Sequence, residues 1–204
     1  MRIRKEEALP VYERLGAVRE KAITMGKIAD ILQARGQLDE ALRIRQDEEL
    51  PVYERLGDVR EKAVTLGKIA DIMEERGQLE EALAMHEKRL QRLRAAGYTQ
   101  DVAQALYSIA KVRILRGDHL RDGLSAVREA LSEAYAIIRK SKRAGALGEI
   151  AKLLIPVLQM AGQTEQALDV LGYAEAAFKQ LGDAQGIAQM QQFRQQIDPV
   201  SPTT

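Results

Sequence analysis

Apolar residues recur along this chain at the spacing of α-helices. Within residues 58–76 the apolar positions step by four, three, four and three residues, at Val59, Ala63, Leu66, Ala70 and Met73. This spacing places them on one face of a helix. No run of alternating apolar and polar residues bounded by turn residues is found, so the sequence predicts no strand.

The ends of these helices also have recognisable residues. Asp58 precedes the apolar run and Glu61 follows three residues later, which is the spacing of a helix-capping box. Gly77 is placed to end the helix in a left-handed conformation. A second helix is predicted from Leu79 to about Gly97.

The helical pattern repeats along the chain. Residues 2–42 align without gaps on residues 43–83, with 31 of 41 positions identical. The identity extends to surface-type residues such as Lys21 and Lys62, which indicates a recent duplication and makes shared surface residues poor indicators of function. Looser copies follow, and the predicted repeats are 2–42, 43–83, 84–124, 125–168 and 169–198.

A fixed period of this size is typical of stacked-repeat proteins. We therefore expect an all-α fold, an α-solenoid of about five antiparallel helix pairs. Residues 1–198 would form a single array that ends in a capping helix, and residues 199–204 a disordered tail.

Three places depart from a regular repeat. Pro10 and Pro51 fall inside second helices and predict a kink there, because proline removes a backbone hydrogen bond. In the fourth copy the second-type helix is expected from Leu124 to about Ala144. Residues 2–15 match the second helix of a pair, and we expect this N-terminal face to be uncapped and a candidate for self-association.

Composition narrows the class of protein. Of the 204 residues, 46% are hydrophobic and 30% are charged, and no apolar run approaches the roughly 18 residues of a membrane helix. Cysteine is absent, which excludes disulfides, cysteine-based metal sites and a cysteine nucleophile. A cytoplasmic protein without a membrane partner is expected.

No catalytic set is found in the sequence. It has no HExxH motif, no phosphate-binding loop and no GxSxG motif. His86 and His119 are the only histidines, and we interpret them as a packing residue and a turn residue. Adjacent acidic residues on a helix point in different directions and do not share a site. We expect no enzymatic activity, cofactor or metal.

The recurring apolar, glycine and alanine positions resemble a tetratricopeptide repeat. In the second copy they are Leu66, Ile69, Ala70, Met73, Gly77, Leu79 and Ala82. The period is near 41, longer than the usual 34. It is similar to the long variant in kinesin light chain, Pins-type adaptors and bacterial regulatory arrays. The resemblance implies a right-handed superhelix and a protein-binding scaffold that belongs to a larger bacterial signalling or effector protein.

The resemblance also implies that the first helices line a concave surface. There the candidate partner-binding residues form a ladder: Lys27, Asp30, Lys68, Asp71 and Lys111. The alternative is a set of local ion pairs, each worth a few tenths of a kcal/mol. Relatives that grip a C-terminal carboxylate use Asn where Asp stands here, and the resemblance therefore argues against such a clamp.

A second candidate surface is basic. Residues 84–148 contain 13 basic and 6 acidic residues, a local net charge of +7. The candidate basic patch is Arg113, Arg116, Arg139, Lys140, Lys142 and Arg143. A solvated helical face is the alternative, and cations near a helix C-terminus are favoured in any case.

These observations predict a protein–protein interaction module that binds a partner segment on its concave surface or at its open end. The alternative is a regulatory module that responds to a peptide or a nucleic acid through residues 84–148. A nucleic-acid partner is disfavoured, because few aromatic side chains are available to stack on bases.

Overall fold

The computed structural model describes residues 7–120, 122–141 and 143–198. Within these ranges the chain is helical and has no strand, which confirms the expected all-α fold of stacked antiparallel helix pairs. It forms two compact units, the first ending at Tyr98 and the second beginning at Thr99. The predicted tail, residues 199–204, and Lys142 of the basic patch lie outside the described residues. A single array over residues 1–198 stays a prediction.

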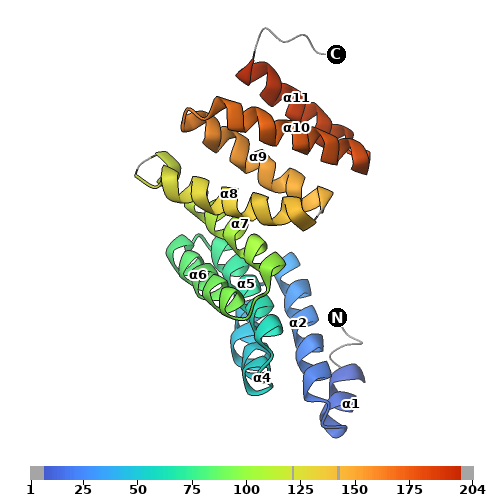
Figure 1. Cartoon of the computed structure of the whole chain (residues 1–204). Coiled ribbons are helices and arrows are strands. Elements are labelled where there is room, and N and C mark those ends of the chain that lie inside the picture. The colour runs from blue at the N-terminus through green and yellow to red at the C-terminus, as the bar shows by residue number, and fades with distance from the viewer. Residues whose placement is uncertain (1–6, 121, 142, 199–204) are drawn as a thin grey trace. The chain divides into compact units, whose positions relative to one another are not determined.

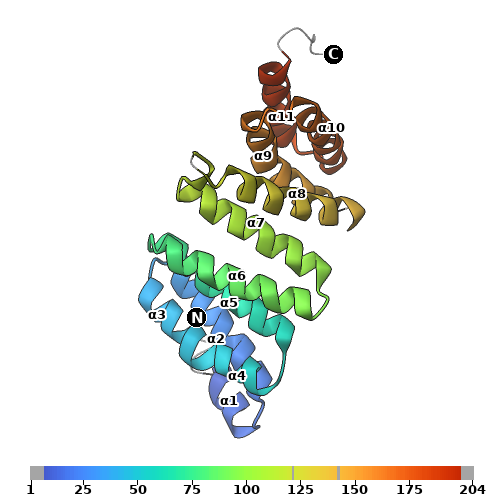
Figure 2. The same cartoon turned by 60° about the vertical axis from the view of Figure 1, so that its left-hand side comes forward.

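The first unit has two helix pairs, preceded by one short helix (Figure 1). The first pair is α2 with three segments that run on from one another, and the second pair is α5 with α6 (Figure 2). The bounds are α1 Leu9–Arg14, α2 Val18–Ala34, α3 Leu38–Arg43, the π-helix η2 Ile44–Glu49, α4 Leu50–Arg55, α5 Val59–Glu75 and α6 Leu79–Ala95. We call α3, η2 and α4 together the α3–α4 rod.

The predicted helix ends of the second pair are confirmed. The Asp58 carboxylate accepts a hydrogen bond from the backbone N–H of Glu61 at 3.0 Å, as a capping residue does. Gly77 follows α5 with φ +75°, a conformation that suits glycine. Because Gly77 turns the chain back, α6 begins at Leu79 and packs along α5.

The irregularity expected at Pro51 takes the form of the π-helix just before it. Pro51 lies in the first turn of α4, where its missing N–H costs least. The π-helix absorbs one extra residue: 21 positions separate Gly36 from Gly57, but only 20 separate Gly77 from Gly97. The matching helix α6 has no proline and is a regular α-helix throughout.

The second unit has two helix pairs, α7 with α8 and α9 with α10, followed by α11. The bounds are α7 Thr99–Leu115, the 3-10 turn η3 Asp118–Leu120, α8 Leu124–Ser141, α9 Ala144–Met160, α10 Thr164–Leu181 and α11 Ala184–Ile197. The helix predicted from Leu124 to about Ala144 is found and begins where expected, but it is shorter at its C-terminal end. α8 ends at Ser141, and Gly145 and Gly148 lie inside α9.

Phe178 explains why glycine occurs inside α9. Its ring is 1% exposed and lies between α9 and α11. A Cβ on Gly148 would come within 2.4 Å of the ring, and a Cβ on Gly186 within 2.3 Å. Both glycines therefore permit helices to approach the ring more closely than any side chain would allow. A pattern of helix-breaking residues cannot reveal such a packing contact.

The N-terminal face is only partly open. Leu9 packs against the core cluster around Met25 and Ile28, contrary to the expectation of an uncapped face. Tyr12 is half-buried and Leu15 is 72% exposed. Among the described residues, the open part of this face therefore includes Val11, which is 38% exposed, and Leu15.

We predict opposite effects for two glycine-to-alanine substitutions inside helices of the second unit. Gly148→Ala drives a methyl group into Phe178 and should destabilise the chain by about 1–3 kcal/mol. Gly172→Ala lies in α10 with no neighbouring atom within 4 Å and should stabilise it by roughly 0.5–1 kcal/mol. Urea unfolding measures both, and equal effects would contradict the packing described for Phe178.

Candidate functional site

The predicted ladder on the first helices is partly an ion-pair network. The Asp30 carboxylate of α2 lies 3.5 Å from the Lys68 ammonium of α5, and 2.6 Å from the guanidinium of Arg45. Lys27 is exposed on the same helix as Asp30. Asp71 follows Lys68 along α5, whereas Lys111 belongs to α7 of the second unit. The structure therefore brings Asp30 and Lys68 into direct contact across two repeats.

Beneath this surface lies a buried charged pair. Arg45 is 2% exposed and Glu49 is 6% exposed, and their side chains are joined at 2.8 Å. The Thr65 hydroxyl donates a second hydrogen bond to Glu49 at 3.2 Å. Burial raises the pKa of the Glu49 carboxyl, although the charge of Arg45 and the hydrogen bonds from Thr65 and Arg45 act in the opposite direction. These interactions join the α3–α4 rod to α2 and α5.

The next repeat fills the corresponding positions differently. His86 is 0% exposed, and its Nε2 lies 3.1 Å from the Glu74 carboxylate. Ligand atoms of Asp71, Glu74 and His86 lie within 4.8 Å of one another, a spacing that a metal ion could use. The His86–Glu74 contact joins two of these three side chains. His86 is a packing residue, as the sequence indicated.

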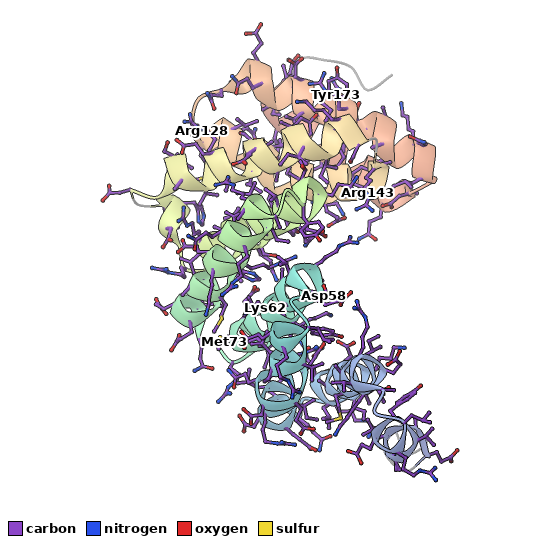
Figure 3. The ribbon with its side chains drawn as sticks, turned by 60° about the horizontal axis from the view of Figure 1, so that its bottom comes forward. Asp58, Lys62, Met73, Arg128, Arg143 and Tyr173 are labelled. Atoms are coloured by element: carbon purple, nitrogen blue, oxygen red, sulfur yellow. The ribbon has the colours of Figure 1, made fainter. Side chains whose placement is uncertain are left out.

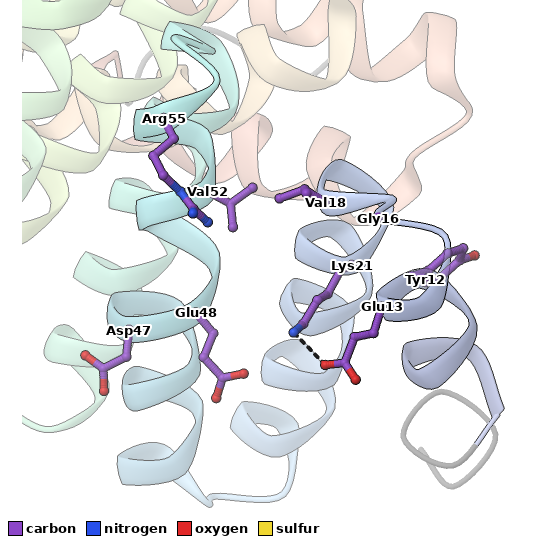
Figure 4. Close-up of a pocket in the computed structure, with 9 residues that line it drawn as sticks. All are labelled: Tyr12, Glu13, Gly16, Val18, Lys21, Asp47, Glu48, Val52 and Arg55. Carbon is purple, nitrogen blue, oxygen red and sulfur yellow. Dashed lines mark hydrogen bonds and ion pairs between the residues drawn. The ribbon is translucent and has the colours of Figure 1, made fainter.

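The largest hollow that we describe lies in the first unit, between α1, α2 and the α3–α4 rod (Figure 4). We call it the N-terminal hollow; its volume is about 580 Å³. Val18 and Val52 face each other across it, and the Lys21 ammonium pairs with the Glu13 carboxylate at 2.6 Å (Figure 4). Its lining residues are Tyr12, Glu13, Gly16, Val18, Lys21, Asp47, Glu48, Val52 and Arg55.

A second hollow of about 330 Å³ lies in the second unit, between α7 and α9. We call it the α7–α9 groove. Ile138 of α8 also lines it, together with residues of α7 and α9. Its lining residues are Gln100, Asp101, Ala103, Gln104, Tyr107, Ile138, Arg143, Gly145, Ala146, Glu149 and Ile150. It therefore combines amide, charged and small apolar side chains.

The candidate basic residues form two separate groups. Arg113 and Arg116 lie around the C-terminal end of α7, whereas Arg139 and Lys140 lie at the C-terminal end of α8. These helices are antiparallel, and the 18 residues of α8 span roughly 27 Å. Arg128, which Figure 3 labels, lies near the start of α8, and Arg143 lies beyond its end, just before α9. The described basic residues do not gather in one place.

Members of both groups also have partners within the chain. The Arg116 guanidinium lies 3.6 Å from the Asp118 carboxylate. Arg139 stacks on the ring of Tyr173 at 4.1 Å and donates a hydrogen bond to its hydroxyl at 2.8 Å. Arg143 lines the α7–α9 groove. Arg139 also lines a smaller hollow of about 210 Å³ between α8, α9 and α10, so two of the described candidate basic residues line a hollow.

Residues 20–95 match the family model of the tetratricopeptide repeat. The predicted resemblance is thereby confirmed over this segment, and the helix pairs of the second unit have the same architecture. Repeats of this kind present extended binding surfaces, so the fold supports a role in protein–protein interaction at a general level. No curated protein matches the sequence.

Solved structures show the same fold. Aspartyl phosphate phosphatase F from Bacillus subtilis is 14% identical with a TM-score of 0.75; the match covers 89% of this chain and 46% of that one. The apo form of RapI is 16% identical with a TM-score of 0.76, covering 97% and 73%. The tetratricopeptide-like repeats of a putative kinesin light chain from Podosopora anserina are 15% identical with a TM-score of 0.60, covering 86% and 96%.

At these identities the similarity shows the fold alone. This chain spans less than half of the length of aspartyl phosphate phosphatase F. Among the described residues, none of the helices combines the length and apolar character needed to cross a membrane.

We predict that Glu49→Gln changes the pH dependence of stability. The folded state holds the Glu49 proton more tightly than the unfolded state, because burial raises the pKa above 4.5. As pH rises past about 4.5, the unfolded chain releases this proton first, and the native chain loses stability relative to the variant. Urea unfolding across this range should show a difference that grows with pH. Parallel profiles would contradict a raised pKa.

Proposed function

We propose that this chain is an interaction module that binds a partner polypeptide in extended form in the α7–α9 groove. The single observation that carries the proposal is the pair of exposed amides in this groove. Gln100 and Gln104 lie one helical turn apart on α7, and both line the hollow. An amide side chain offers a donor and an acceptor together. An extended segment has both groups free along its backbone.

Small residues support a close approach of that backbone. Ala103 lies on α7, and Gly145 and Ala146 lie in the first turn of α9. A Cβ on Gly145 would find its nearest neighbour in Leu181 at 3.9 Å, so glycine leaves space there instead of relieving a clash. A peptide main chain could therefore lie against the helix surface with little steric cost.

The charges of the groove give the proposed partner an orientation. Arg143 stands on one side, and Glu149 lies further along α9, where Lys152 holds its carboxylate at 2.7 Å. A segment with an acidic residue placed to meet Arg143 fits this arrangement. Because the described basic residues form two groups, we give no role to a continuous basic patch or to nucleic acid.

We further propose that this module works as a scaffold within a larger signalling or effector protein. Two of the similar structures are longer than this chain, and the match covers 46% and 73% of them. In such a protein the groove would transmit partner binding to another domain. Catalysis by the repeats themselves is not part of the proposal.

The test uses peptides that are selected from a random display library for binding to the full chain. We expect fluorescence anisotropy to show about tenfold weaker binding by the double variant Gln100→Ala with Gln104→Ala, because two amide contacts are lost. The matched control is Gln191→Ala with Gln195→Ala, an exposed pair one turn apart on α11.

Equal affinities for the two double variants would place the binding site elsewhere and contradict the proposal. A library that yields no binding peptide would contradict it as well. Circular dichroism and urea unfolding of both variants confirm that any loss of affinity arises at the surface.

A further inference from the structure

We propose that the N-terminal hollow receives a lysine or arginine side chain of a partner polypeptide. This site lies in the first unit and is built from other residues than the α7–α9 groove. It does not rest on the function proposed for that groove. The hollow has a counterpart at the same place in the next repeat, where other side chains stand.

The near-identical repeats share one wall of this place. In the first repeat Glu13 of α1 pairs with Lys21 of α2. In the second, the corresponding Glu54 of α4 pairs with Lys62 of α5. The ion pair and the backbone that carries it are thus reproduced 41 positions along the chain.

The opposite wall differs between the repeats. Counting back from Gly57 and Gly97, Glu48 of the rod corresponds to Lys88 of α6, and Val52 corresponds to Arg92. The pKa of Glu54 is lowered, first by the hydrogen bond from Lys62 and then by the charges of Lys62, Arg92 and Lys88. In the second repeat, the chain's own Arg92 and Lys88 therefore act on Glu54, the residue that corresponds to Glu13.

At the two corresponding positions of the first repeat the rod carries no cation, although Arg55 of α4 also lines the hollow. A valine and a glutamate replace the arginine and the lysine, and the hollow of about 580 Å³ lies beside them. The internal repeat thus shows which side chains complete this site: long basic ones, which would act on Glu13 as Arg92 and Lys88 act on Glu54.

The lining of the hollow suits such a side chain. Val18, Val52 and Tyr12 offer apolar surface for an aliphatic stem. Three carboxylates line the hollow against two cations, Lys21 and Arg55, and Lys21 is already paired with Glu13. Glu48 is held by Arg43 at 2.8 Å. Asp47 is exposed, and no ion pair is described for it within residues 7–120.

The π-helix sets these carboxylates at the edge of the hollow. Asp47 and Glu48 both belong to η2, the segment in which the α3–α4 rod accommodates its one extra residue relative to α6. The extra residue changes which side chains face α1 and α2 over this turn. The second repeat, which lacks the extra residue, has Lys88 and Arg92 one turn apart on a regular helix.

That arrangement also indicates the form of the partner. Two basic side chains four residues apart on a helix occupy this place in the second repeat. A partner helix with lysine and arginine at the same spacing would present the same groups from outside. A polypeptide therefore fits the hollow better than a free small cation, which lacks the stem contacts of a neighbouring helix.

The experiment measures fluorescence anisotropy of a labelled, alanine-rich helical peptide with one lysine and one arginine one turn apart. Two single variants, Glu48→Lys and Val52→Arg, place the basic residues of the second repeat at the corresponding positions of the first. We expect each to weaken binding by about tenfold or more, because the chain then supplies its own cation. Glu48 is half-buried at the surface, so Glu48→Lys tests the proposal even if Val52→Arg does not fold.

Matched controls add the same charge elsewhere in the first unit. Glu81→Lys and Gln91→Arg lie at exposed positions of α6 and should leave the affinity unchanged. An equal loss in these controls would show that net charge alone governs binding, and would overturn the proposal. Absence of binding to the native chain would overturn it too.

A competition experiment distinguishes a polypeptide side chain from a small free cation as the ligand of the hollow. Spermidine and free arginine should displace the peptide only at concentrations far above that of the unlabelled peptide. Displacement at equal concentrations would make the hollow a small-cation site and overturn the polypeptide proposal. Binding of the peptide does not depend on Gln100 or Gln104, so failure here and failure of the α7–α9 groove can be told apart.

Discussion

In both units, a buried side chain of one helix fills the space that a glycine on a facing helix leaves empty. Phe178 lies against Gly148 and Gly186 in the second unit, and Glu49 lies against Gly26 in the first. A Cβ on Gly26 would come within 2.6 Å of the Glu49 carboxylate. These contacts fix how closely the helices approach, and the surfaces that remain open follow from that separation. Interiors packed at this density do not adjust to an added methyl group without strain.

The constraint has an electrostatic consequence in the first unit. A carboxylate held against a helix backbone is removed from water, so it needs a partner at short range. Arg45 supplies that partner and also reaches Asp30 at the surface. The residues predicted to bind a partner are therefore tied to the core, and Asp30 and Lys68 serve packing as well as any binding. The exposed amides of the α7–α9 groove line an open hollow instead, and for this reason the groove is the better candidate for recognition.

Sequence reasoning succeeded where local chemistry decides the structure. Asp58 and Gly77 bound α5 as predicted, because capping and left-handed turns depend on a few adjacent residues. It failed where contacts between distant residues decide. Gly148 lies inside α9 because Phe178 packs against it, and Glu49 is buried against Gly26, and neither contact follows from the neighbouring sequence. The π-helix did leave a signal, the unequal spacing of Gly36–Gly57 and Gly77–Gly97, whereas the two hollows depend on which side chains meet across helices and left none.

The central claim is that the α7–α9 groove, and not the duplicated surface of the first unit, receives an extended polypeptide. The most direct measurement is a proton–nitrogen NMR titration of the full chain with a library-selected peptide. The account predicts shifts concentrated on the amides of Gln100, Gln104, Gly145 and their neighbours. Shifts concentrated on α2 and α5, around Asp30 and Lys68, would contradict it.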